Sequence, residues 1–298
     1  MDNRAEIRDF LKSRRDRITP EQAGLPVYGS RRVAGLRRGE VALLAGVSVE
    51  YYTRLERGNL GGVSDSVLDA LAQALRLDET ERTHLYDLAR AANTTPGRAR
   101  RRPAASGVRP TVQRMLDAMP TVPAIVRNNR FDFVAANPLG HALFSEMYAD
   151  PTCGANSARF SFLTTAGRRF YLDWERVAGN IVGALRVEAA KNPYDRELSN
   201  LIGELSTRSD AFRVLWGAHD VHVFREGLKR LRHPVVGDLE LEHETMLLPD
   251  ESGLQVAMYS APPGSPGEDA LKLLASWSAT MADADADAAR AADTEPIG

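Results

Sequence analysis

Apolar positions that recur every three or four residues predict a first, all-helical domain. In the first segment Ile7, Phe10 and Leu11 fall on one helical face. Short helices with the same period follow, and the fifth begins with Asp78 and Glu81 in the spacing of a capping box. The five predicted helices cover residues 3–17, about 37–45 and 49–57, and segments that begin at Ser64 and Asp78.

After residue 110 the pattern changes to alternating apolar and polar positions, which predicts strands. Two strands are expected around the turn Asn128-Asn129, and three more in 221–233, 237–248 and 253–261. Helical periods lie between and after them, at about 138–147, 165–191, 195–207, 209–218 and 269–277. Strands, a helical insertion and then three antiparallel strands are typical of an α+β domain with one sheet.

The predicted organisation is therefore multidomain. It has four parts: an all-α domain at 1–93, a basic Pro/Gly-containing linker at 94–110, an α+β domain at 111–278, and a low-complexity acidic tail, predicted to be disordered, at 279–298.

Composition narrows the class of protein. The apolar fraction is 43% and the charged fraction 26%, as in ordinary globular proteins. The single cysteine, Cys153, allows no internal disulfide, and no apolar run is long enough to suggest a membrane span. We therefore expect a soluble, cytoplasmic protein without a membrane partner.

The net charge differs between the first 110 residues and the rest of the chain. Residues 1–110 hold 20 Lys and Arg against 14 Asp and Glu, a net of +6, whereas the remainder holds 18 against 26, a net of −8. This asymmetry indicates that only the first part meets a polyanion.

The segment Ala45-Gly46-Val47-Ser48 joins two predicted helices by too few residues for an ordinary linker. Glycine permits the reversal, Val47 would fill the space between the helices, and Ser48 would cap the second helix. The expected core positions are Val41, Leu44, Tyr52 and Leu55, and the outward ones are Ser48, Val49, Glu50, Tyr51 and Arg54. Such an arrangement suits a recognition helix in the DNA major groove. Two packed helices without a nucleic-acid role are the alternative.

The stretch LRRGEVALLAGVSVEYYTRLERG resembles the xenobiotic-response-element (XRE, lambda-repressor-like) helix-turn-helix family. The resemblance implies that Val49, Glu50 and Arg54 read bases, and that Arg38 holds a phosphate or a flanking base. Arg54 suits guanine, Glu50 a cytosine amine and Val49 a thymine methyl. Tyr51 would reach the DNA backbone while Tyr52 packs. Glu56 is expected to pair with Arg14 or Arg15.

Two basic segments leave alternatives open. Arg31 and Arg32 lie in a link that is longer than in the minimal repressor fold, and they either contact phosphates or solvate a loop. The five arginines of the 94–110 linker likewise either add phosphate contacts or belong to a solvated hinge.

The whole chain is similar to the MmyB-like transcriptional regulators. The similarity runs through GLRRGEVALLAGVSVEYYTRLERG, FDFVAANPLGHALF, WGAHDVHVFREGLKRLRHPVVGDLELEHE and YSAPPGSPGEDALKLLASW. It implies a PAS-like ligand-binding fold after the DNA-binding domain, and that family includes fatty-acid binding in the second domain.

Catalytic and metal motifs are sparse. The sequence contains no GxGxxG, GxxxxGK[ST], GxSxG or HExxH, and we expect neither catalytic residues nor a cofactor. His219 and His222 would share a metal only on a helix, and this stretch leads into a strand, so no metal site is expected. His219 either hydrogen-bonds with Asp220 to fix the helix–sheet junction or contacts a pocket.

An aromatic and aliphatic stripe provides the candidate ligand contacts. Phe170, Trp174, Val177 and Ile181 have the spacing of one helical face, which is core unless the domain encloses a cavity. The candidate lining consists of Phe144, Phe170, Trp174, Val177, Ile181, Trp216 and His219.

These patterns predict a transcription regulator that binds double-stranded DNA and responds to a small, mainly apolar ligand. The resemblance implies that it works as a homodimer and that its ligand is of the fatty-acid kind. Two alternatives remain for the second domain: an enzyme that transforms its ligand, or a dimerisation module without one.

Overall fold

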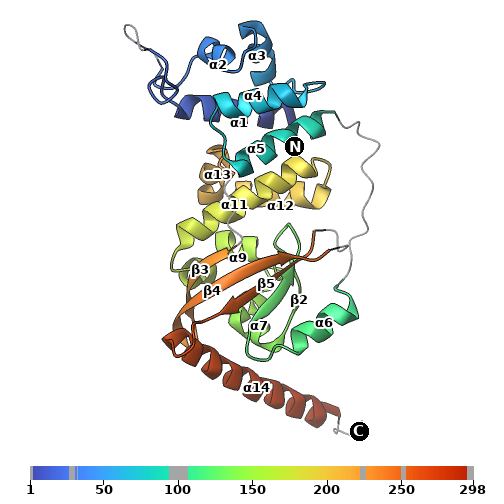
Figure 1. The fold of residues 1–298 in the computed structure, drawn as a ribbon. Helices are drawn as coiled ribbons and strands as arrows, with labels where there is room; N and C mark the ends of the chain where they lie inside the picture. The colour runs from blue at the N-terminus through green and yellow to red at the C-terminus, as the bar shows by residue number, and fades with distance from the viewer. Residues whose placement is uncertain are drawn as a thin grey trace. The chain divides into compact units, whose positions relative to one another are not determined.

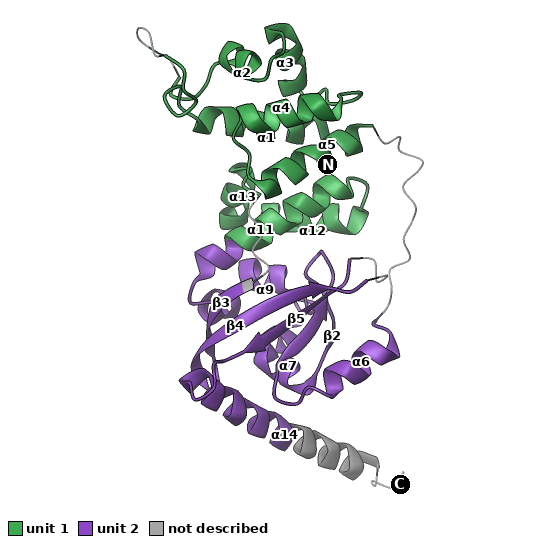
Figure 2. Ribbon diagram, in the orientation of Figure 1, with its two compact units in different colours: residues 1–101, 179–223 green, residues 102–178, 224–298 purple. Residues whose placement is uncertain are grey.

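The computed structural model describes residues 3–26, 31, 33–93, 107–221, 226–249 and 253–293. The chain divides into two compact units (Figures 1 and 2). Unit 1 consists of residues 1–101 and 179–223, and unit 2 of residues 102–178 and 224–298. The division falls inside one helix, α11 (Trp174–Lys191), so that part of the predicted second domain is packed with the N-terminal residues.

Unit 1 is all-helical. Its N-terminal part confirms the five predicted helices, and the C-terminal part of α11 and two later helices complete it. The bounds are α1 Asn3–Arg17, α2 Arg38–Leu44, α3 Val49–Glu56, α4 Asp65–Ala74, α5 Glu79–Ala92, α12 Arg196–Arg208 and α13 Asp210–Gly217. One apolar core joins the two stretches, since Ala190 and Val221 belong to the same cluster as Ile7, Phe10 and Leu88.

Local sequence signals account for most helix starts in this unit. Asp78 accepts a hydrogen bond from the Glu81 amide at 2.8 Å and Glu81 bonds the Asp78 amide in return, which is the predicted capping box. Leu44, in contrast, was expected in the core and is 37% exposed. The rotation of α2 turns Ala42 and Ala45 inward instead.

The turn between α2 and α3 depends on a glycine. Gly46 has a φ of +65°, in the left-handed region that favours glycine. A Cβ atom added there would meet nothing within 4 Å. The requirement at this position is therefore conformational and not steric.

We expect Gly46→Ala to lower the free energy of unfolding of unit 1 by about 1 kcal/mol, because the left-handed conformation is energetically unfavourable for alanine. Gly46→Asn should cost less, since asparagine tolerates that conformation. Gly203→Ala is the matched control: it lies inside α12 without a positive φ or a close neighbour, and should be neutral or stabilising. Urea unfolding measures all three, and equal effects of Gly46→Ala and Gly203→Ala would contradict the argument.

Unit 2 combines helices with a five-stranded antiparallel sheet of order β2-β1-β5-β4-β3. Its elements are α6 Pro110–Asp117, β1 Ala124–Arg127, β2 Phe133–Ala136, α7 Pro138–Leu143, α8 Ser145–Ala149, α9 Ser157–Leu163, α10 Thr165–Phe170, the beginning of α11, β3 Glu226–His233, β4 Gly237–Leu247, β5 Gln255–Ser260 and α14 Pro266–Asp293. All predicted strands are present.

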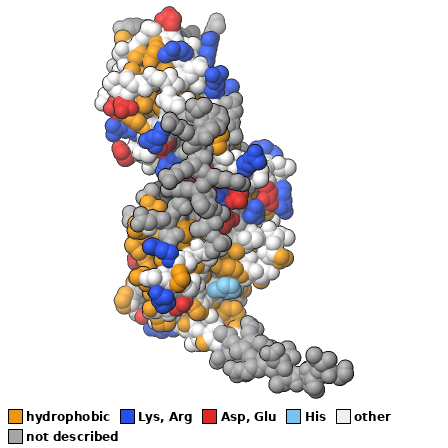
Figure 3. Space-filling model, turned by 90° about the vertical axis from the view of Figure 1, so that its right-hand side faces the viewer, with side chains coloured by type: hydrophobic (Ala, Val, Ile, Leu, Met, Phe, Trp, Pro, Cys, Tyr) orange, Lys and Arg blue, Asp and Glu red, His pale blue; other side chains and the backbone are white. Residues whose placement is uncertain are grey.

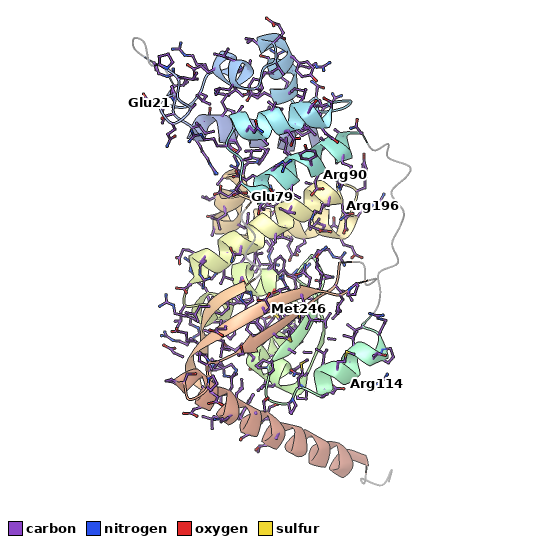
Figure 4. The ribbon with its side chains drawn as sticks, viewed as in Figure 1. Glu21, Glu79, Arg90, Arg114, Arg196 and Met246 are labelled. Carbon is purple, nitrogen blue, oxygen red and sulfur yellow. The ribbon has the colours of Figure 1, made fainter. Side chains whose placement is uncertain are left out.

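The two faces of the sheet differ. The inner face carries buried Leu231, Leu239 and Leu241, and α7 and α9 lie on that side (Figure 1). The outer face packs against α6 at one end. Over β4 the outer face is exposed to solvent: the Met246 side chain there is 49% exposed (Figure 4).

Several predicted boundaries were wrong. The helix expected over 165–191 is two helices, because the backbone of the residues between them bonds to β3: the Leu172 amide donates to the Arg230 carbonyl at 3.0 Å. The predicted Asn128-Asn129 turn is a longer loop closed by a bond from the Asn128 amide to the Asp132 carbonyl. Sequence reasoning missed α6 and α9. Helix α14 continues to Asp293, into the tail predicted to be disordered, where alanine favours helix.

Candidate functional sites

Helices α2 and α3 form the helix-turn-helix that the sequence predicts. The Ser48 hydroxyl accepts a hydrogen bond from the Tyr51 amide at 3.0 Å and so caps α3. Tyr52 and Leu55 are fully buried, as expected, and Val47 packs against the core. One side of α3 is thereby fixed to the core, which leaves the other side free to present its side chains.

The outward side of α3 carries the predicted base-reading residues. Val49 is 45% exposed, and Glu50 and Arg54 are exposed. The Arg54 guanidinium lies over the ring of Tyr51, 4.8 Å from its centroid. This contact holds a long, flexible side chain in an outward position and lowers the conformational entropy that binding would remove.

A buried carboxylate ties Arg38 to α1 and α3. Glu56 has a side chain only 2% exposed, and it accepts bonds from Arg15 Nη2 at 2.9 Å and from Arg38 Nε at 3.0 Å. The Arg15 pair confirms the expected partner of Glu56. The Arg38 side chain remains 52% exposed, so its two terminal nitrogens can face a phosphate while Glu56 holds its Nε.

A phosphate contact needs an arginine whose donors are free, whereas the terminal nitrogens of Arg31 are already bonded within the protein. It donates to both Glu40 carboxylate oxygens, at 2.7 and 2.8 Å, and to the Gly35 carbonyl at 3.0 Å. Its side chain is 14% exposed. The pair joins the loop to the start of α2. The neighbouring candidate Arg32 lies outside the described residues.

The Arg31–Glu40 pair makes the stability of unit 1 depend on pH. The bonds from Arg31 outweigh the effect of burial and hold the pKa of Glu40 at about 2, below its ordinary 4.5. A depressed folded pKa gives stability that is present above the unfolded pKa and lost as the pH falls through 4.5 towards 2. We expect Glu40→Gln to cost about 1 to 3 kcal/mol at pH 7. The difference from wild type should shrink between pH 5 and 2 in urea unfolding, and a pH-independent difference would contradict this.

Four of the seven candidate ligand contacts lie in unit 2. Phe144, Phe170, Trp174 and Val177 are each 7% exposed or less. The Phe144 ring lies 5.5 Å from Phe170 and 5.7 Å from Tyr259 on the inner face of the sheet. Because α10 and α11 are separate, Phe170 does not share a helix with Trp174. Side chains from several elements, and not one helical stripe, form this aromatic cluster.

The other three, Ile181, Trp216 and His219, lie in unit 1. Trp216 stacks on Phe212 and has the Arg186 guanidinium 4.2 Å from its ring centroid. His219 accepts from Arg186 at 2.9 Å. Asp220 pairs with Arg17 and not with His219.

These contacts belong to a buried charge cluster that sequence reasoning missed. We define it as Glu6, His84, Arg186 and His219. Arg186 is fully buried and pairs with Glu6, whose side chain is 8% exposed. Burial raises the pKa of Glu6, but bonds and charges from His219 and Arg186 outweigh it and hold that pKa at about 2. Burial lowers the pKa of His84 to about 3, so its ring is neutral.

Among the described residues, His, Cys, Asp and Glu form no group of three that could hold a metal ion. His222 falls outside that part. Nor does any described helix combine the length and apolar character that crossing a membrane demands.

Two family models match the chain. A helix-turn-helix domain model matches residues 6–85, over the motif described above. The MmyB-like transcription regulator ligand binding domain model matches residues 108–274, more than half of the chain. The chain belongs to the MmyB-like transcription regulators. A comparison with curated proteins gave no match.

The match joins a DNA-binding domain to a ligand-binding domain, which is the composition of a ligand-regulated transcription regulator. In this MmyB-like regulator the ligand-domain model includes 179–221, the helices that pack with the N-terminal residues in unit 1. The family boundaries and the compact units therefore divide the chain differently.

Proposed function

We propose that this MmyB-like regulator binds a specific DNA duplex through α3 and changes its DNA affinity when its second domain binds a small, mainly apolar ligand. The observation that carries the proposal is the outward row of Val49, Glu50 and Arg54 on a helix whose opposite side is fixed in a buried core. A cytoplasmic homodimer on a two-fold symmetric site is part of the proposal.

Base readout is assigned to three side chains of different chemistry. The exposed Arg54 guanidinium can bond guanine through two nitrogens, Glu50 can accept from a cytosine amine, and Val49 can contact a thymine methyl. Arg38 and Tyr51 would position the motif on the DNA backbone. The surface drawn in Figure 3 intermingles basic, acidic and apolar side chains. We assign specificity to these individual side chains, because contacts to base edges carry the sequence information.

The ligand is assigned to the interior of unit 2. Aromatic and aliphatic side chains supply an apolar surface between the sheet and its helices, and Phe144, Phe170, Trp174 and Val177 are the proposed contacts. A fatty-acid-like molecule suits such a surface. The ligand would shift the population of DNA-competent molecules, which requires different affinities for the two states.

Native mass spectrometry of the purified protein, compared with its denatured mass, tests the ligand and the subunit number together. A discrete added mass that is lost on denaturation would support the sensor, and a doubled mass would support the homodimer. If extracts of varied polarity leave both the bare mass and DNA affinity unchanged, the second domain is a dimerisation module. Chemical conversion of a bound molecule would instead favour an enzyme.

A further inference from the structure

One buried carboxylate joins three helices of the helix-turn-helix region. Glu56 ends α3, and its side chain is 2% exposed. Its Oε1 atom accepts two bonds from Arg15 of α1, from Nη2 at 2.9 Å and from Nε at 3.3 Å. Its Oε2 atom accepts one bond, of 3.0 Å, from Nε of Arg38, the first residue of α2. The two oxygens therefore hold two arginines, and the surroundings of these arginines differ.

The donors of Arg15 are all engaged inside the protein. Its Nη1 donates to the Leu36 carbonyl at 2.7 Å and lies 3.0 Å from a carboxylate oxygen of Asp16. Its Nε and Nη2 are bonded to Glu56, so every nitrogen of this guanidinium has a partner. Arg15 thus fixes the position of Glu56 and supplies its counter-charge. Glu56 does not depend on Arg38 for neutralisation.

Arg38, in contrast, has donors to spare. About half of its side chain is exposed, and it is bonded only through Nε; within the described ranges neither terminal nitrogen has a hydrogen-bond partner. The two terminal nitrogens form the distal edge of the guanidinium and can donate two parallel bonds to one phosphate. Because the group is planar, a bond that holds Nε also fixes the plane of the terminal nitrogens.

The bond between Glu56 and Arg38 matters more for binding than for stability. A pair with one half-exposed member contributes little to folding, since water screens it. An unrestrained arginine loses much rotamer freedom when it binds a phosphate, and a bond that is formed beforehand removes part of that loss.

We propose that Glu56 is a positioning residue for DNA binding: it holds Arg38 so that both terminal nitrogens donate to one phosphate of the duplex. The proposal rests on the proposed DNA-binding function of α3 and adds to it a residue that does not itself touch DNA. Its consequence is a reversed sign. A carboxylate close to DNA ordinarily weakens binding by repelling phosphates, whereas this carboxylate strengthens binding.

The sign of one effect tests the proposal. Glu56→Gln removes a negative charge at nearly constant shape, and it should weaken binding of the full-length protein to selected and random duplexes alike by about fivefold, because Arg38 loses a charge-assisted bond. Asp65→Asn is the control for charge alone. This exposed acid begins α4, its carboxylate has no partner among the described residues, and its loss should leave the affinity unchanged or raise it. Tighter binding by Glu56→Gln would overturn the positioning role.

Arg38→Ala completes a double-mutant cycle. Alone it should lower the affinity and reduce the slope of log affinity against log salt by about 1, as the loss of one phosphate contact does. In this background Glu56→Gln should weaken binding no further, because the side chain that it positions is absent. A second loss of about fivefold in the double variant would mean that Glu56 acts through the fold and not through Arg38, which would overturn the proposal.

A further variant spares the core. Glu56→Gln leaves Arg15 with a neutral partner, whereas Arg38→Lys leaves the bonds between Glu56 and Arg15 intact. A single ammonium cannot face the carboxylate with one nitrogen and the phosphate with two others. Arg38→Lys should therefore lose most of the affinity that Arg38→Ala loses, although its charge is unchanged. Wild-type affinity of Arg38→Lys would contradict the proposal even if Glu56→Gln fails to fold.

The same titrations separate this inference from the proposed function. If wild type binds a selected duplex and Glu56→Gln binds it more tightly, the positioning role is wrong and DNA binding by α3 stands. If wild type selects no duplex from a random library, the proposed DNA-binding function is overturned, and the role of Glu56 with it.

Discussion

Replacing Arg186 by methionine is expected to lower the free energy of unfolding of unit 1 by about 3 to 5 kcal/mol at pH 7. The substitution keeps an apolar side chain beneath the Trp216 ring, which Arg186 now covers at 4.2 Å. It removes the arginine partner of Glu6, whose carboxylate is almost fully buried and keeps His219 nearby at 3.6 Å. The loss comes mainly from a carboxylate charge that has lost its arginine and remains where water cannot solvate it.

The variant Glu6→Gln in the Arg186→Met background separates charge from packing. With both charges removed, most of the stability should return, so the double variant is expected to be more stable than Arg186→Met alone. The penalty of Arg186→Met should also decrease below neutral pH, because burial then raises the pKa of Glu6 and the carboxyl takes up a proton.

Hydrogen exchange in peptides from α1 and α5 reports these changes for unit 1 separately from unit 2. The control is Arg213→Met, which breaks an exposed pair with Asp210 on α13 and should change stability by less than about 1 kcal/mol. If Arg186→Met and Arg213→Met lower the free energy of unfolding equally, burial of the Glu6–Arg186 pair contributes nothing to stability.

The second large effect is expected at the DNA surface. Arg54→Ala should weaken binding to a duplex selected from a random library by about 10- to 100-fold, with little change on random DNA, because the proposed bidentate contact to guanine would carry that discrimination. The preference at a single base pair should relax. Arg54→Lys should retain part of the affinity but not the preference, since an ammonium lacks the planar fork.

Binding titrations at one fixed salt concentration make this comparison, because phosphate contacts alone produce a strong salt dependence. Arg38→Ala is the informative counterpart: it should weaken selected and random duplexes alike, as a backbone contact would. Equal losses on both kinds of DNA for Arg54→Ala would remove Arg54 from the base-reading residues.

The helix-turn-helix was predictable from the sequence because its determinants are local. The turn glycine, the Ser48 cap and the spacing of buried residues all fall within a few residues of one another. Leu44 was misplaced because a helix of seven residues offers little periodicity, and a small rotation exchanges leucine for alanine at the core.

Contacts between distant segments were not predictable. Glu6 and Arg186 are 180 residues apart, and nothing in either local sequence marks it as one half of a buried pair.

The pairing of Glu6 with Arg186 also has a consequence for synthesis of the chain. Helix α1 leaves the ribosome early, but its buried partner follows 180 residues later. At about 5 to 20 residues per second the interval is roughly 10 to 40 seconds. During this time the early helices lack the segment that completes their core, and contact with Ala190 and Val221 is still to come. The DNA-binding half of this regulator thus reaches its final packing only after most of the sensor has been made.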